Sequence, residues 1–433
     1  MWRSAYVMFR AVSGVGFWVE RRFTRAGLLV LGGLVLAAVF GIDTSLTVAY
    51  RIFALCTTLL LLAIAAAWFG RSPLVVRPQL PHTLTAGEPF TLRVDIRNPS
   101  QKPIDGVQLR AELADPRPSF REFRARLRFP TYRGWARLVW SNRVAYLEEA
   151  PLPVLAAREE MQIQVRGKAL RRGRLHIDRI EIAQADPLGL FRKLTSGGGA
   201  ADICVLPKRY ALPALPLPGA RRYQPGGLAE GAAVGDSEEF LGLRDYRPGD
   251  ALQRIHWRSF ARVGKPVIKE YQNEYIARYA LVLDTFGHAD SDQRAREAFE
   301  EAVAVAASFA WTIDTQECLL DLMFVGGEIH SYTAGRGQLL ASRLLEVLSG
   351  VAISTEDSFA TLVQLVRARR EQLSGCICIL LTWDDERKAL VDTLRAGGAV
   401  VLPLVVSAQP LADLPAGVRR LTPGKIAEEL MTL

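Results

Sequence analysis

The chain has 433 residues, enough for two or three domains, and its 49% hydrophobic and 23% charged content is that of an ordinary globular protein. Its five scattered cysteines exclude a disulfide framework, and no Cys/His cluster has the spacing of a zinc site. The formal net charge of +9 is unevenly spread. Residues 71–222 hold 27 Lys/Arg and 14 Asp/Glu, whereas residues 223–433 hold 21 and 29, so a basic middle precedes an acidic end.

Two apolar runs follow a basic N-terminus of residues 1–25. "AGLLVLGGLVLAAVFGI" ends at residue 42 and is near the lower length limit for a bilayer span, whereas "LTVAYRIFALCTTLLLLAIAAAWF" at 46–69 is comfortably long. Arginines flank the pair and the connecting "DTS" has none, so the positive-inside rule predicts two transmembrane helices over residues 26–70 with both ends in the cytoplasm. The alternative is a first run that is a cleaved signal peptide, but a second, longer span follows at once.

Residues 74–210 predict a β-rich domain. "EPFTLRVDIRNPSQKPIDGVQLRAEL" alternates apolar and polar residues and breaks at a turn-rich "NPSQKP". "EEMQIQVRGKALRRGRLHIDRIEIAQADPLGLF" alternates again, with "RRGR" as its turn. Several such strands indicate a small β-sandwich.

An arginine-rich segment, "SFREFRARLRFPTYRGWARLVW", lies inside that domain and has three interpretations. The arginines line the solvated face of β-hairpins, or contact anionic lipid headgroups beside the membrane, or bind single-stranded nucleic acid. No nucleic-acid-binding module accompanies them, so we expect no nucleic-acid partner.

A Pro/Gly-rich connector and a densely charged segment occupy residues 211–277. Between residues 236 and 274, seven acids match seven bases, which predicts internal ion pairs rather than a phosphate-binding surface. We therefore expect this segment to fold against the first strand of the following domain and to fix that domain relative to the β-domain. Its expected network is Arg244, Asp245, Asp250, Arg254 and Arg258, with Trp257 packed beneath it.

Residues 278–433 alternate between strand and helix patterns. "YALVLDTF", "ECLLDLMFVG", "CICILLTW" and "AVVLPLVV" predict buried strands, and amphipathic helices are predicted at 292–313, 338–350, 359–373 and 385–398. This alternation predicts an α/β domain with a doubly wound, mostly parallel sheet. Asp284 and Asp384 then fall at the carboxyl ends of strands, where such folds bind ligands. Cys376 and Cys378 should share one face of a buried strand.

The charged segment "EEFLGLRDYRPGDALQRIHWRSFARVGKPVIKEYQNE" resembles the signature of the bacterial "domain of unknown function 58" family. "RRGRLHIDRIEIAQADPLGLFRK" followed by "VLPKRY" resembles the second landmark of that family. His256 stands where the family often has Asp. The signature and interaction residues expected from this resemblance are Arg244, Tyr246, Gly249, Asp250, Arg254, Trp257, Arg258 and Arg262.

Members of this family resemble von Willebrand factor A-type proteins and are often encoded beside MoxR-type AAA+ ATPases. The resemblance implies a von Willebrand factor A-like C-terminal domain and a membrane-anchored protein. Together with the two predicted spans, this gives a multi-pass protein of the bacterial inner membrane with cytoplasmic soluble domains. It also implies a non-catalytic adaptor role, in which the protein partners such an ATPase and its client complexes in assembly or activation. The alternative is a lipid-associated cell-envelope scaffold that uses its basic middle domain.

A von Willebrand A-type metal site needs Asp-x-Ser-x-Ser after the first strand, because two hydroxyls and a carboxylate suit Mg²⁺. Here the five residues are Asp284, Thr285, Phe286, Gly287 and His288, so both serine positions are lost. The favoured interpretation is a degenerate site around Asp284 and Asp384 with no cofactor, and the alternative is a site that still binds Mg²⁺. We interpret His288 as a loop histidine rather than a zinc ligand.

Catalytic signatures are missing from the sequence. The chain lacks a P-loop, HExxH, GxSxG and a Rossmann glycine fingerprint, and the Gly-Lys pairs in "RVGKP" and "TPGKI" lack the rest of a Walker motif. The sequence therefore predicts a protein that is not an enzyme.

Overall fold

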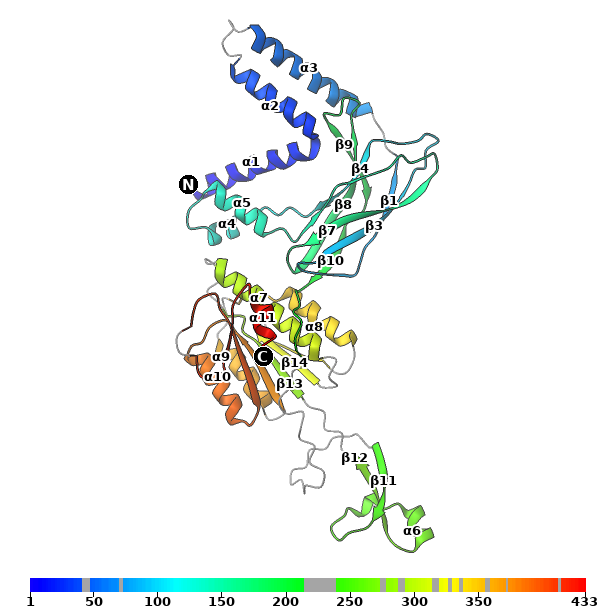
Figure 1. Cartoon of the computed structure of the whole chain (residues 1–433), viewed down its shortest axis with the longest axis vertical. Helices are drawn as coiled ribbons and strands as arrows, with labels where there is room; N and C mark the ends of the chain where they lie inside the picture. Colours follow the sequence, from blue (N-terminus) through cyan, green and yellow to red (C-terminus); the bar gives the residue numbers. More distant parts are fainter. Residues whose placement is uncertain are drawn as a thin grey trace.

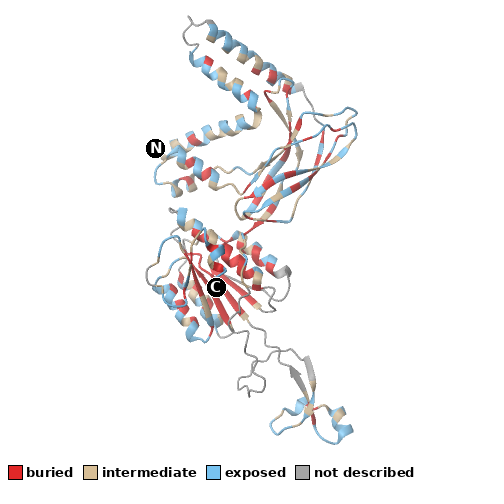
Figure 2. Ribbon diagram, in the orientation of Figure 1, coloured by how far each residue is buried: buried red, intermediate tan, exposed pale blue. Residues whose placement is uncertain are grey.

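The computed structural model describes residues 1–40, 47–69, 73–213, 239–272, 278–286, 293–313, 319–325, 329–334, 338–354, 359–370, 373–411 and 414–433. The described parts follow one another along the long axis of the molecule, from a group of helices through a β-rich domain and an α/β domain to a small hairpin unit (Figure 1). Buried residues concentrate in the β-rich and α/β domains, whereas two of the N-terminal helices are largely exposed (Figure 2).

Three helices begin the chain: α1 (Trp2–Arg22), α2 (Arg25–Phe40) and α3 (Thr47–Phe69). α2 and α3 lie side by side (Figure 1). Among the described residues, one helix is long and apolar enough to cross a membrane, over Val48–Trp68 of α3, whereas α2 is apolar but has 16 residues. Length and composition thus support one candidate span, whereas two were predicted. α1 is a helix in the region where only a basic N-terminus was predicted.

Two sheets build the β-rich domain. Inward-facing residues of both sheets, such as Val94, Val165 and Ile182, share one core, which is the arrangement of a β-sandwich. The first sheet has the order β1 (Val75–Gln79), β3 (Pro89–Arg97), β7 (Glu160–Ala169), β5 (Ala145–Leu147). The second has the order β2 (Thr83–Thr85), β10 (Ala201–Leu206), β8 (Gly173–Ala185), β4 (Val107–Leu113), β6 (Ala150–Pro151), with β9 (Arg192–Gly198) paired to β8.

The arginine-rich segment is helical, so the interpretation as β-hairpins is wrong. It forms α4 (Phe120–Arg126) and α5 (Tyr132–Ser141). Ser119 and Glu122 make a reciprocal capping box at the start of α4, and the Thr131 hydroxyl caps α5, so local hydrogen bonds favour helices here. Trp135 and Leu138 are buried at helical spacing and face α1 together with Phe123.

The α/β domain is a six-stranded sheet with helices on both faces, which confirms the predicted doubly wound sheet. The strands β13 (Arg278–Leu283), β14 (Leu319–Val325), β15 (Ile329–Ala334), β16 (Gly375–Leu380), β17 (Val400–Val406) and β18 (Arg419–Leu421) have the order β15-β14-β13-β16-β17-β18, and β15 runs antiparallel. One face carries α7 (Gln293–Ile313), α8 (Gln338–Gly350) and α11 (Ile426–Leu430). The other carries α9 (Phe359–Arg369) and α10 (Asp385–Ala396).

Arg172 and Tyr210 join the β-sandwich to the α/β domain. Arg172, in the turn between β7 and β8, donates to Glu300 at 2.5 Å and to the carbonyl of Val351 at 2.7 Å. The Tyr210 amide donates to the Ser308 hydroxyl at 2.7 Å. Burial lowers the pKa of Arg172, and the charge of Glu300 counters this effect. These contacts fix one domain against the other.

The charged segment forms a separate unit, which we call the hairpin head (residues 239–272). β11 (Glu239–Asp245) and β12 (Val267–Gln272) pair with each other in a two-stranded sheet, and η1 (Leu252–Arg254) and α6 (Trp257–Val263) lie between them. The head projects beyond the α/β domain, at the end of the molecule away from α3 (Figure 1). For residues 239–272, the prediction that this segment packs against β13 and fixes the two domains is therefore wrong. Residues 214–238 and 273–277 of the predicted connector lie outside the described residues.

Candidate functional site

The hairpin head folds around a small core of its own. Ile255, Val267 and Ile268 are buried, and Ile255 pairs with Ile268 as an isolated bridge. The His256 amide donates to the Val267 carbonyl at 2.8 Å, which ties the start of α6 to β12. Gly264 ends α6 at a φ of +71°, a conformation that costs glycine little. The head therefore has a defined shape without help from the sheet of the α/β domain.

Two of the predicted signature residues form a bidentate ion pair. The Arg244 guanidinium donates to both carboxylate oxygens of Asp250 at 2.7 Å, and the Arg247 amide donates to the same carboxylate at 2.8 Å. The hydrogen bond from Arg244 and then that from the Arg247 amide lower the pKa of Asp250 to about 2. Gly249, at a φ of +107°, makes the turn that brings Asp250 back to Arg244. This pair fixes the loop after β11.

The other signature residues lie around that pair. The Tyr246 amide donates to the Pro266 carbonyl at 3.0 Å, and Arg254 lies in η1. Arg258 and Arg262 are exposed on α6. Trp257 is 63% exposed, so the prediction that it packs beneath the ion-pair network is wrong. Sequence reasoning missed this because an aromatic residue among charges looks the same whether it covers a network or faces solvent.

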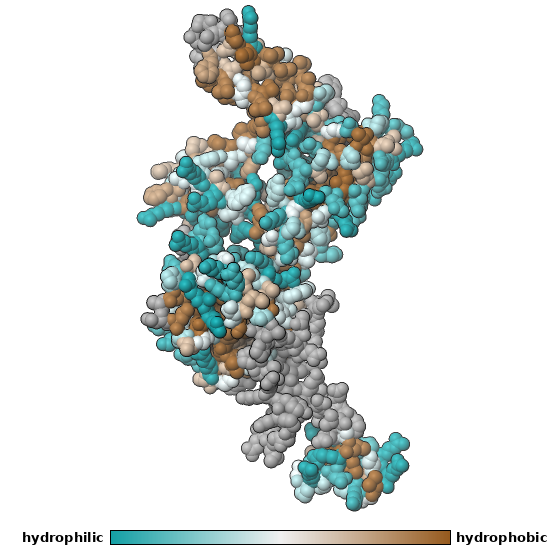
Figure 3. Space-filling view, viewed as in Figure 1, coloured by the Kyte–Doolittle hydropathy of each residue, from teal (hydrophilic) through white to brown (hydrophobic). Residues whose placement is uncertain are grey.

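The head exposes an apolar group that we call the hairpin patch: Leu243 (44% exposed), Leu252 (65%), Trp257 (63%), Phe260 (37%) and Val263 (61%). Apolar side chains are visible among hydrophilic ones on this unit (Figure 3). Trp257 and Phe260 meet edge to face with ring centroids 6.0 Å apart. Residues 239–272 also carry seven Lys/Arg against four Asp/Glu. An apolar centre with a charged rim is the composition of a protein-binding surface.

A second candidate lies where the strand order of the α/β domain reverses, between β13 and β16. Asp284 follows β13 and Asp384 precedes α10, as predicted, and ligands of doubly wound folds bind at this switch point. Asp284 is fully buried, whereas the Asp384 side chain is 46% exposed. The structure thus brings together the two carboxylates that the sequence placed at strand ends.

Arg387 occupies the space between these carboxylates. Its Nε lies 3.0 Å from Oδ2 of Asp284 and its Nη1 lies 2.6 Å from Oδ2 of Asp384. The guanidinium also lies over the ring of Phe359, 4.2 Å from the centroid. Sequence reasoning missed Arg387. The signal was a cation three residues after Asp384, in a first helical turn where acidic residues are usual.

At the switch point, burial and ion pairing have opposite effects on the charged groups. Burial raises the pKa of Asp284, and hydrogen bonds from Arg387 and from the backbone amides of Phe286 and Leu381 counter that rise. Burial opposes the charged form of Arg387, but the hydrogen bond and charge of Asp284 outweigh it and raise the pKa of Arg387. Two hydrogen-bonded opposite charges in a dry site hold each other in place.

Among the described residues, the donor set does not fit a divalent cation. The Thr285 hydroxyl donates to the Val325 carbonyl, Phe286 offers no side-chain oxygen, and the guanidinium of Arg387 already neutralises Asp284. Gly287 and His288 lie outside the described residues. The absence of a cofactor stays a prediction, but the position of Arg387 gives it a physical basis.

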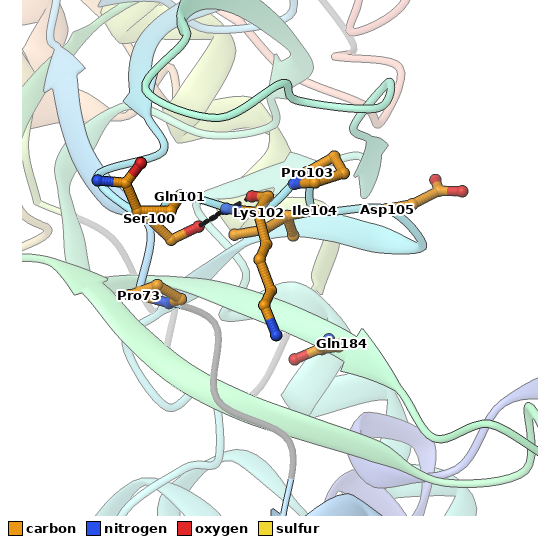
Figure 4. Close-up of a pocket in the computed structure, with 8 residues that line it drawn as sticks. All are labelled: Pro73, Ser100, Gln101, Lys102, Pro103, Ile104, Asp105 and Gln184. Carbon is orange, nitrogen blue, oxygen red and sulfur yellow. Dashed lines mark hydrogen bonds between the residues drawn. The ribbon is translucent and has the colours of Figure 1, made fainter.

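A hollow of about 490 Å³ lies beside the loop between β3 and β4 (Figure 4). The Ser100 hydroxyl in it is engaged by the backbone of Lys102, donating to the carbonyl at 2.9 Å. Asp105 points away from Lys102 and Gln184, so the polar side chains do not converge on one point (Figure 4). This hollow therefore lacks the geometry of a binding site.

Comparison with known proteins supports the family resemblance. Residues 242–384 match the model of the family described as "Protein of unknown function DUF58". The chain is 23% identical over 182 residues to the "Uncharacterized protein YeaD" of Bacillus subtilis (strain 168). That alignment covers 41% of this chain and 42% of the relative, so the chain spans less than half of the length of that protein.

Similarity to solved structures is weak. An α-2-macroglobulin from Salmonella is 15% identical, over 31% of this chain and 7% of that chain, with a TM-score of 0.19. A CARDB domain from Pyrococcus furiosus is 12% identical, over 30% of this chain and 93% of that chain, with a TM-score of 0.18. Scores this low carry no argument about the fold. The predicted resemblance to the DUF58 family is confirmed over residues 242–384, which contain most of the hairpin head and both carboxylates of the switch point.

Proposed function

We propose that this protein is a membrane-anchored, non-catalytic adaptor that presents its hairpin head to a partner protein. The observation that carries the proposal is the hairpin patch, an exposed apolar group on a unit that projects away from α3 (Figure 1). The Trp257 side chain is 63% exposed, so it adds little to the core of the head and is available to a partner. Tryptophan and arginine are the residue types that most often dominate binding energy at interfaces.

The partner that we propose is a MoxR-type AAA+ ATPase, together with its client complexes, as the family resemblance implies. The basic excess of the head complements an acidic surface around an apolar pocket. The proposed role is assembly or activation of those complexes. In this role the chain positions the ATPase and its clients and catalyses no reaction itself.

We propose that the chain is anchored in the bacterial inner membrane, and α3 supports this anchoring. Its apolar stretch Val48–Trp68 is long enough to cross, and we propose that α2 enters the bilayer beside it. The 16 residues of α2 measure about 24 Å, short of a hydrocarbon core of about 30 Å. Arg25 at the start of α2 lies where the positive-inside rule places cytoplasmic charge, so the soluble domains face the cytoplasm.

We also propose that the α/β domain is von Willebrand factor A-like and independent of metal. The strand order, the antiparallel β15 and the position of Asp284 at the switch point support this. Arg387 supplies the positive charge that a cation would supply.

Binding of the full-length chain in lipid nanodiscs to a purified MoxR-type ATPase tests the adaptor role. Trp257→Ala removes the largest side chain of the patch, and a hot-spot loss of about 2 kcal/mol weakens binding roughly 30-fold. Trp140→Ala is the matched control, because Trp140 is also 63% exposed but lies on α5. Equal binding by wild type and both variants would contradict the proposal.

The alternative function is a lipid-associated cell-envelope scaffold that grips the inner leaflet with its middle domain. One observation favours it, a set of exposed arginines on and beside α4 and α5: Arg121, Arg124, Arg128, Arg133 and Arg137. Flotation of residues 71–433 with anionic liposomes separates the two functions. Because this fragment lacks α1, which packs on Phe123 and Trp135, only the salt-dependent part of the flotation reports on the arginines. Flotation that disappears as salt rises supports the scaffold, whereas no flotation at any salt concentration supports the adaptor.

A further inference from the structure

One face of α1 is covered by protein. Phe9 of α1 meets the ring of Phe123 with centroids 6.1 Å apart, and Tyr6 meets Trp135 at 5.6 Å. Trp2 also packs on Phe123, at 5.6 Å. This aromatic layer holds α1 against α4 and α5, so the covered face of the helix is fixed.

The opposite face of α1 is apolar and exposed. Its large side chains are Val7 (60% exposed), Met8 (54%), Val12 (53%), Val15 (63%) and Trp18 (52%). At 3.6 residues per turn these positions fall on one stripe, together with Ser4 and Ala11, and the stripe carries no charge between residues 4 and 18. Exposed apolar surface of this kind usually marks a contact with another protein or with a membrane. The second face of α1 therefore needs a partner.

The corner between α1 and α2 is held firmly on the β-sandwich. Arg21, near the end of α1, forms ion pairs with Glu112 and Glu181. The Thr24 amide donates to the Leu190 carbonyl at 3.1 Å. A Cβ atom on Gly27 would lie 1.9 Å from that carbonyl oxygen, so only glycine permits this approach of α2.

The second landmark of the sequence, "ADPLGLF", builds the other side of the corner. The Asp186 carboxylate accepts hydrogen bonds from the amides of Leu190 and Phe191 at 2.7 and 2.6 Å, which sets the loop. Leu190 and Phe191 then pack in one cluster with Leu60 and Ala63 of α3. The same loop thus fixes α1, α2 and α3 relative to one another.

We infer that the exposed face of α1 lies in the cytoplasmic interface of the membrane, with lipid covering Val7, Met8, Val12, Val15 and Trp18. The inference rests on the proposed anchoring through α3. α4 and α5 lie on one side of α1, and α2 and α3 leave toward the other, so the uncovered face is on the side of the proposed spans (Figure 1). Two residues, 23 and 24, separate α1 from α2, so α1 ends at the surface that α2 enters.

The charges around the stripe fit a lipid surface better than a second protein. Arg3 and Arg10 are exposed beside it, and Arg22 and Arg25 lie at the end where α2 begins. Amphipathic helices with this distribution lie in the plane of the interface, where basic residues meet anionic headgroups and Trp lies at headgroup depth. A helix held flat there would set the tilt of the β-sandwich and keep the hairpin head away from the bilayer.

Depth-dependent fluorescence quenching of the full-length chain in nanodiscs tests this inference. An environment-sensitive fluorescent amino acid is placed at position 15, at position 61 in α3, or at position 257 in the head. Lipids carry a spin label near the headgroup or deep in the acyl chain. We expect position 15 to be quenched more by the shallow label, position 61 more by the deep label, and position 257 by neither.

Quenching at position 61 without quenching at position 15 would overturn the α1 inference while the anchoring stands. Absence of quenching at position 61 would overturn the anchoring itself. Val12→Asp, introduced with the probe at position 15, should reduce shallow quenching without loss of melting temperature, because Val12 is exposed. The matched control is Ala136→Asp, an exposed position on α5, which should leave quenching unchanged. Equal quenching in both variants would contradict the inference.

Discussion

The switch point and the hairpin head each contain an Asp–Arg pair, yet the two pairs have opposite surroundings. Asp284 and Arg387 have 0% and 9% of their side chains exposed, whereas Asp250 and Arg244 have 20% and 33%. At the switch point Arg387 pairs with both Asp284 and Asp384. At the head the pair only shapes a loop, and the apolar patch beside it stays open to solvent. The difference indicates that, among the described residues, Arg387 closes off Asp284 at the expected ligand position of the fold, whereas the hairpin patch on the projecting unit is accessible.

The largest expected loss of stability comes from breaking the ion pair at the switch point. Asp284→Ala leaves the guanidinium of Arg387 buried without its main partner, which should reduce the free energy of unfolding by about 3–5 kcal/mol. Denaturant unfolding of the full-length chain in detergent measures this loss. The matched variant Asp250→Ala, at the exposed pair, should cost much less. Similar losses for the two variants would remove the distinction between a closed and an open site.

A smaller effect is expected at the junction of the two domains. Arg172→Ala removes hydrogen bonds to Glu300 and to the Val351 carbonyl and should cost about 2 kcal/mol of unfolding free energy. Arg258→Ala on the head should change it by less than about 0.5 kcal/mol. A larger loss for Arg258→Ala would revive the idea that the charged segment holds the domains together.

Trp257→Ala should leave stability within about 0.5 kcal/mol of wild type, because its side chain is exposed. Trp135→Ala, at a position 1% exposed beside α1, should cost about 3–5 kcal/mol in the same unfolding experiment. A strongly destabilised Trp257→Ala protein would show that this tryptophan supports the fold rather than a partner.

The smallest effect is local and depends on pH. The folded-state pKa of Asp250, about 2, lies below the unfolded value near 3.8, so ionised Asp250 stabilises the head above the unfolded value. That stabilisation is lost as pH falls from about 4 through about 2. The ¹³C signal of the Asp250 carboxyl, assigned with Asp250→Asn, should titrate near the lower value. Titration near 3.8 would exclude the bidentate pair with Arg244 in solution.

Much of the α/β domain is predictable because each buried strand is a short apolar run and each helix has apolar residues at helical spacing. The helix 338–350 matches α8, and the alternation of Cys376 and Cys378 places their sulfur atoms 3.5 Å apart on one face of β16. β15 and β18 were not predicted, because edge strands lack the long apolar runs of buried ones. The two switch-point acids could be predicted because each lies shortly after the end of a predicted strand.

The contacts of the hairpin head and of the N-terminal helix could not be predicted from local sequence patterns. Matched charges between residues 236 and 274 indicate ion pairs, but they do not say which element each charge meets, and β11 pairs with β12 instead of with the larger sheet. In α1, apolar residues lie on two faces, and the local sequence does not say which of the two faces packs against protein. Its aromatic face is explained by α4 and α5, which come more than 90 residues later in the chain.

The central claim is that partners meet the hairpin head and not the switch point. Photocrosslinking measures this directly, with a benzophenone amino acid at position 257 or at position 384 of the full-length chain in nanodiscs. Asp384 is a suitable comparison because its side chain is 46% exposed at the mouth of the switch point. We predict crosslinks to the MoxR-type ATPase from position 257 and none from position 384. Crosslinks from position 384 with none from position 257 would contradict the account.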